Sequence, residues 1–189
     1  MTQDQINAIK SRIGEALVEA LLREAGYEVC RTGKESRFQN MTKTDRAPAP
    51  DFVVFRPSNS GLFRLFHLEV KYRANIESFL KDEAEKGAQS LFEEQSKWPA
   101  LSLIMVTDQP LRGQSCFQVV NLSQYQTGQP LQTKDLADWE LLDTPRDVIS
   151  SYQAAAQDLF SALTYQAQLG RHLRELRGAE PHGMKVGVA

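Results

Sequence analysis

The sequence predicts an α/β fold with its elements in the order helix, three strands, helix, strand, followed by a C-terminal helical segment. Apolar residues recur every three or four positions over residues 4–25, which is typical of an amphipathic helix. Two apolar runs, 51–55 and 63–68, flank a polar turn and therefore predict a hairpin. A continuous apolar run at 101–106 follows a second helical pattern and predicts a further strand.

The first helix should end at Gly26, since glycine is common just after a helix C-terminus, and residues 27–31 should form a short strand. The apolar positions of this first helix are Ile6, Ile9, Ile13, Leu17, Ala20 and Leu21. In the hairpin, a turn at 56–61 would bring Asp51 close to Glu69. Lys71 follows Glu69 by two positions and should share its face of the strand, as should His67.

Charged residues at alternate positions of an apolar strand cost free energy unless they are paired, solvated or bound to a metal.

Beyond this strand, residues 76–98 predict an amphipathic helix with an interruption near Gly87. The run at 101–106 is typical of a strand buried on both faces, and 116–120 predicts a strand at one edge of the sheet.

The polar stretch 121–133 predicts a loop, and 139–142 a small packing element. Residues 147–177 predict a long helix or a helix pair broken at Gly170, which could serve packing, dimerisation or DNA contact. We therefore expect a core at 1–125, a helical extension at 126–177 and a disordered tail at 178–189.

The composition predicts a soluble globular protein. Of 189 residues, 41% are hydrophobic and 24% charged, and no apolar run reaches the roughly 18 residues that span a bilayer. The N-terminus lacks the layout of a secretory signal, so we expect a reducing, cytoplasmic setting in which Cys30 and Cys116 are small buried thiols. A net charge of −2 argues against a protein that coats nucleic acid through its overall charge. A local basic surface could still bind phosphates.

A basic segment between residues 31 and 46 is a candidate DNA-facing loop, with a solvated loop of mixed charge as the alternative. Its basic residues are Arg31, Lys34, Arg37, Lys43 and Arg46, against two acids. Tyr72 and Arg73, directly after the hairpin, could also reach a substrate backbone.

With this element order in place, Pro50-Asp51 followed by Glu69-Val70-Lys71 resembles the PD-(D/E)XK nuclease superfamily, which includes restriction enzymes and Holliday-junction resolvases. The resemblance covers residues 10–107 and implies a restriction-endonuclease-like αβββαβ core, with a mixed central sheet flanked by helices. Gly14-Glu15 in the first helix is also similar to the start of many such domains.

The resemblance implies that Asp51 and Glu69 hold Mg²⁺ or Mn²⁺, with Glu15 completing the ligand set. Lys71 would orient the attacking water or stabilise charge on the phosphate, and Gln89 in the second helix would be an accessory residue. Hard carboxylate oxygens suit such cations. Glu15, however, lies nearly opposite the expected apolar stripe of its helix, so a solvent-facing position is the alternative.

The leading hypothesis is a metal-dependent endonuclease that hydrolyses DNA phosphodiester bonds in restriction, repair, recombination or mobile-element biology. Cleavage of both strands would favour a homodimer formed through the C-terminal helix. One alternative is a non-catalytic nucleic-acid-binding or protein-interaction module on the same fold. Another discards the resemblance: Asp51 starts a turn, and Glu69 and Lys71 make cross-strand pairs on the exposed sheet of an interaction module.

Overall fold

A computed structural model describes residues 2–32, 49–57, 63–89, 91–93, 98, 101–120 and 131–178. Within these residues, six strands form one sheet whose spatial order follows the sequence. The β3 and β4 strands are parallel, and all other neighbours are antiparallel. The predicted mixed α/β class is thus confirmed. The strands are β1 (Glu28–Arg31), β2 (Phe52–Pro57), β3 (Phe63–Tyr72), β4 (Leu101–Val106), β5 (Phe117–Val120) and β6 (Thr133–Asp135).

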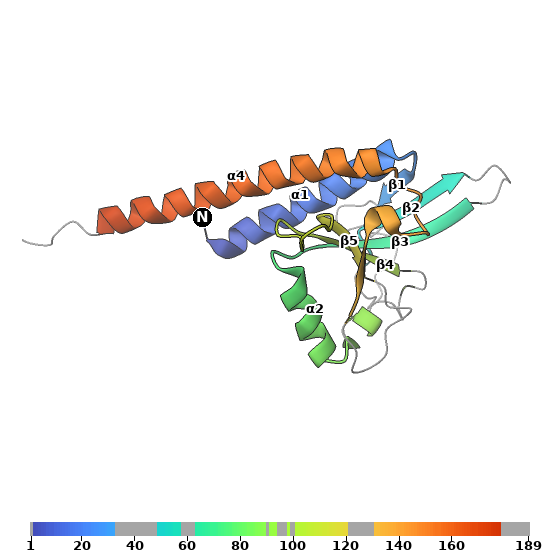
Figure 1. Cartoon of the computed structure of the whole chain (residues 1–189), viewed down its shortest axis with the longest axis horizontal. Coiled ribbons are helices and arrows are strands. Elements are labelled where there is room, and N and C mark those ends of the chain that lie inside the picture. Colours follow the sequence, from blue (N-terminus) through green and yellow to red (C-terminus); the bar gives the residue numbers. More distant parts are fainter. Residues whose placement is uncertain are drawn as a thin grey trace, which may run out of the picture.

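Helices cover both faces of this sheet. On one face lie α1 (Gln3–Glu24) and α4 (Arg146–Gly178), side by side and running in opposite directions, while α2 (Ile76–Glu85) lies on the other (Figure 1). The central strand β4 divides its side chains between the two layers. Ile104 and Val106 belong to the cluster beneath α1 and α4, and Leu103 and Met105 to the cluster beneath α2. The prediction of a strand buried on both faces is therefore confirmed.

The first helix is confirmed, but its buried face differs from the predicted stripe. Thr2 and Gln5 form a reciprocal capping box at its start, and Gly26, with φ of +86°, follows its end. Ile9 is 36% exposed, whereas Lys10 is 3% exposed. The buried positions are Ile6, Lys10, Gly14, Val18, Leu21 and Leu22. The stripe shifts because Lys10 finds a buried ion pair and Gly14 packs closely against Val106.

The second helical region breaks where it was predicted to break. The α2 helix ends at Glu85, and Gly87 then adopts φ of +69°, a conformation that glycine tolerates better than other residues. In contrast, α4 continues without a break through Gly170 and is a single helix.

The far end of the sheet corrects one expectation, the position of β5. The β5 strand is internal, because β6 pairs along its outer side and forms the edge of the described sheet. The β6 strand could not be predicted from periodicity, because its three residues, Thr133–Asp135, are all polar. The adjoining 3-10 turn η2 (Leu136–Asp138) has no such pattern either. The small packing element is confirmed, since Trp139 packs on the core and Leu142 is buried.

One hydrophobic core spans the expected boundary between residues 125 and 126. Leu136, Ile149 and Phe160 from the C-terminal part join Val18 and Val70 in a single cluster. In the described part of the chain, no helix combines the length and apolarity needed to cross a membrane.

The two cysteines are both free but differ in burial. Cys116 is buried as expected, and burial raises the pKa of its thiol to about 12. Cys30 is exposed, so the expectation of a buried thiol there is wrong. It lies on the edge strand β1, where the alternation directs Val29 into the core and Cys30 outward.

Candidate metal-binding site

The β2–β3 hairpin brings Asp51 to the Glu69-Val70 peptide. Phe52 pairs with Leu68, so Asp51, one residue earlier, stands opposite Glu69 just before the start of β2. The Val70 amide donates a hydrogen bond of 2.8 Å to Asp51 Oδ2. This contact fixes the Asp51 carboxylate beside the backbone from which the Glu69 side chain extends. The predicted approach of these two residues is confirmed.

Glu69 and Lys71 lie on the face of the sheet that α2 partly covers. Their neighbours across the parallel β3–β4 pair are Leu103 and Met105, which pack beneath α2. Lys71 Nζ lies 4.0 Å from Glu69 Oε1, with the two side chains 19% and 25% exposed. The pair is therefore half-buried at the margin of an apolar layer. This position differs from that of a cross-strand pair on an open sheet face.

The donor chemistry of this pair suits a hard divalent cation. Mg²⁺ is commonly bound through one or two carboxylates, and water or substrate oxygens fill its other positions. Asp51 and Glu69 could supply those two carboxylates. Among the described residues, no group of three or more His, Cys, Asp or Glu side chains is positioned to hold a metal. Asp51 and Glu69 therefore fit Mg²⁺ as a pair of carboxylate ligands, with water or substrate oxygens in its other positions.

Glu15 lies on α1, the helix that covers the opposite face of the sheet. It is half-buried beside Gly14 and Val18, two members of the helix's buried stripe, so a fully solvent-facing position is excluded. It forms no three-carboxylate group with Asp51 and Glu69. Its contribution to a metal site stays a prediction. One turn later, Glu19 joins α1 to β1 through an ion pair with Arg31.

His67 shares the strand face of Glu69 but packs against an aromatic ring. Its ring centroid lies 5.4 Å from that of Trp98. Its buried Nδ1 has no hydrogen-bond partner among the described residues. The ring contact supports a packing role for this histidine.

The expected DNA-contacting residues fall into two groups. Lys34, Arg37, Lys43 and Arg46 lie outside the described residues. Arg73 is half-buried, with its guanidinium carbon 4.6 Å from the centroid of the Phe79 ring on α2, and it donates a hydrogen bond of 2.8 Å to the Tyr72 carbonyl.

Two other expected contacts have different surroundings. Tyr72 is buried on the α1 side of the sheet, so the expectation that it reaches a substrate backbone is wrong. Gln89 is exposed and donates to Glu93 one turn later, a pairing that an exposed helix amide makes without any site nearby.

The sequence interpretation missed a buried polar network between α1, α4 and the end of β4. Lys10 forms an ion pair with Asp108, and its Nζ lies 2.8 Å from Thr164 Oγ1. The Tyr72 hydroxyl donates to the other carboxylate oxygen of Asp108 at 3.0 Å. Burial first, and then the Asp108 charge, raise the pKa of Tyr72. The sequence signal for this network was Lys10 itself, a charged residue at helical spacing between the apolar residues Ile6 and Ile13.

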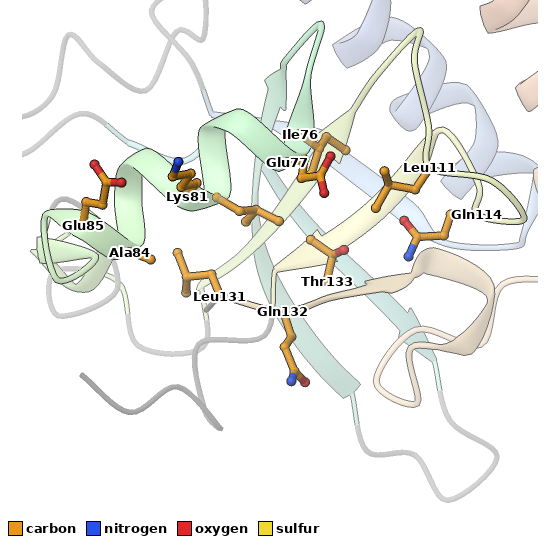
Figure 2. Close-up of a pocket in the computed structure, with 11 residues that line it drawn as sticks. Ile76, Glu77, Lys81, Ala84, Glu85, Leu111, Gln114, Leu131, Gln132 and Thr133 are labelled. Carbon is orange, nitrogen blue, oxygen red and sulfur yellow. The ribbon is translucent and has the colours of Figure 1, made fainter. Parts of the chain in front are cut away.

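A pocket of about 690 Å³ lies elsewhere, between α2 and the segment that leads into β6 (Figure 2). Leu80, Ala84 and Leu131 supply apolar walls, and Glu77 and Lys81 supply charges. Asp51, Glu69 and Lys71 do not line it. Because it is separate from the carboxylates and lysine, the pocket gives no support to the phosphodiesterase chemistry.

No protein-family model, curated protein or solved structure matches the chain at a significant level.

Proposed function

We propose that this protein is a Mg²⁺-dependent endonuclease that hydrolyses DNA phosphodiester bonds. The observation that carries the proposal is the contact between the Val70 amide and Asp51 Oδ2, which holds Asp51 next to Glu69, with Lys71 on the same strand face. This combination places two hard anionic ligands and one cation close together on the β2–β3 hairpin. Phosphodiester hydrolysis uses such groups, because the carboxylates can hold a metal ion, and the ion and the ammonium can neutralise negative charge on the phosphate.

Each residue has a distinct role in this proposal. A bound Mg²⁺ would polarise the phosphodiester and lower the pKa of coordinated water. Asp51 and Glu69 would hold the ion, and the hydrogen bond from the Val70 amide holds the Asp51 carboxylate in place beside Glu69. Lys71 would place its ammonium near the phosphate, where it stabilises developing negative charge. The half-buried position strengthens these interactions relative to open water.

The element order adds support for a restriction-endonuclease-like arrangement, which we propose as the finer description of the fold. One helix, three antiparallel strands, a second helix and a parallel fourth strand occur in succession. The two acids lie on β3 and at the start of β2, on the hairpin that forms the middle of this unit. That is the layout implied by the sequence resemblance.

The test is cleavage of supercoiled plasmid, linear duplex and branched DNA in Mg²⁺ or Mn²⁺. Wild type should cut at least one of these substrates, and Glu69→Ala and Lys71→Ala should abolish cutting at matched folding. The matched controls are Glu28→Ala and Lys134→Ala, which remove a glutamate and a lysine from exposed strand positions remote from the site. Both controls should cut like wild type. Cutting that survives in the Glu69 or Lys71 variant would overturn the proposal.

A non-catalytic binding module is the alternative outcome of the same experiment. The observation that favours it is that, within the part of the chain that the structure describes, no third carboxylate joins Asp51 and Glu69 in a metal-binding group. In that case wild type would bind DNA and cut none of the substrates with either metal.

A further inference from the structure

The α4 helix carries two apolar stripes, and the protein's own core uses one of them. Ile149, Ala156, Phe160 and Ala167 are buried against the body of the domain. Two hydrogen bonds join α4 to the antiparallel helix α1: Lys10 donates to Thr164, and the Tyr152 hydroxyl donates to Glu24. The second stripe lies on a different side of the helix and is exposed in the single chain.

This second stripe follows a seven-residue repeat. It consists of Ala155, Leu159, Ala162, Gln166 and Leu169, with alternating spacings of four and three, and the same spacing continues in the sequence at Leu173 and Leu176. Leu159 is 45% exposed and Leu169 is 40% exposed. An apolar repeat of 3.5 residues is the pattern by which two helices pack along their length, and one polar position within it sets the register.

We infer that this stripe is a dimer interface, in which α4 packs antiparallel against α4 of a second copy of the chain. A twofold axis beside Tyr165 places Leu159 opposite Leu169 of the second copy, and Ala162 opposite Gln166. Each small side chain then meets a larger one, which fills the interface evenly. Tyr165, 62% exposed, meets its own counterpart beside the axis.

The charges that flank the stripe select this orientation. In the antiparallel register, Asp158 lies opposite His172 of the second copy, and both side chains are exposed in the single chain. A parallel, in-register pairing would stack Ala162 on Ala162 and leave a gap between two wider layers. It would also place Asp158 beside Leu163 of the second copy, so the acid would lose its basic neighbour.

The oligomeric state of the full chain tests the interface without any activity measurement, so its outcome is independent of the proposed nuclease. Light scattering after size exclusion should give twice the monomer mass for wild type. Leu159→Glu with Leu169→Glu should raise the dissociation constant at least about 100-fold, because two apolar layers would then carry four buried charges. Leu65→Glu, at a leucine 52% exposed on β3, is the matched control and should remain dimeric.

Cross-linking tests the orientation. In a Cys30→Ser background, which removes the exposed native thiol, Tyr165→Cys should form a covalent dimer with a short bis-maleimide. Leu159→Cys should not form one, since its counterpart lies far along the antiparallel pair. Gln157→Cys, exposed and outside the stripe, is the negative control. A monomeric wild type, or a Leu159→Cys cross-link without a Tyr165→Cys cross-link, would overturn the inference.

Discussion

Removal of the Asp108 carboxylate would leave a buried ammonium without its counter-ion. Lys10 and Asp108 side chains are 4% and 14% exposed, so neither is well solvated. Removing one partner of a buried pair typically destabilises a protein by about 3–5 kcal/mol. Thr164 Oγ1, 2.8 Å from the Lys10 ammonium, would retain one hydrogen bond, which favours the lower end. We therefore expect Asp108→Ala to reduce the free energy of unfolding by about 3 kcal/mol.

A second substitution distinguishes the loss of charge pairing from a loss of packing. Lys10→Met replaces the ammonium with an apolar chain of similar length. Introduced into Asp108→Ala, it should restore stability, because it removes the uncompensated charge from a site next to the Tyr72 and Phe160 rings.

Urea unfolding followed by circular dichroism measures both effects. The control is Asp138→Ala, which breaks an ion pair to Arg146 whose side chains are 49% and 73% exposed and should cost less than about 1 kcal/mol. The reasoning is refuted if Asp108→Ala costs no more than the control, or if Lys10→Met lowers the stability of Asp108→Ala further.

Two further predictions concern ionisable groups. Cys30 should react quickly with a thiol reagent at pH 8, and Cys116 should stay protected until the protein unfolds, because its pKa of about 12 leaves about 10⁻⁴ of it as thiolate; equal labelling rates in the native protein would contradict this. Burial opposes ionisation of Glu19, but hydrogen bonds from Arg23 and Arg31 outweigh it and lower its pKa below 4.5. Glu19 therefore stabilises the fold above pH 4.5, and this contribution is lost as the pH falls through its folded pKa. Glu19→Gln should lower the unfolding midpoint at pH 7, and the gap to wild type should close in acid; a gap constant across pH would show that the charge is irrelevant.

Local pattern was sufficient to predict the hairpin and its acids. Strand alternation and a short connection determine which residues of β2 and β3 face one another, so Asp51 and Glu69 could be paired from spacing alone. Local sequence also located the break in the second helix, because Gly87 interrupts the helical pattern and adopts a positive φ.

Expectations failed where partners distant in sequence decide the outcome. Lys10 is buried because Asp108 and Thr164, about 100 and 150 residues away, supply its partners. The β6 strand is held by pairing with β5, since its three polar residues carry no strand pattern of their own. Cys30 is exposed because β1 is an edge strand of the described sheet and its alternation directs Cys30 away from the core, and its sequence does not reveal that position in the sheet.

The central claim is that the charge of Asp51 serves metal-dependent cleavage and not merely the hairpin. Asp51→Asn tests this most directly, because the amide oxygen can still accept from the Val70 amide 2.8 Å away while the negative charge is removed. The measurement is the single-turnover rate of DNA cleavage in Mg²⁺, beside an unfolding curve for each protein. The account predicts an unchanged fold and a rate lower by about 100-fold or more. A variant that folds normally and cuts at the wild-type rate would contradict it.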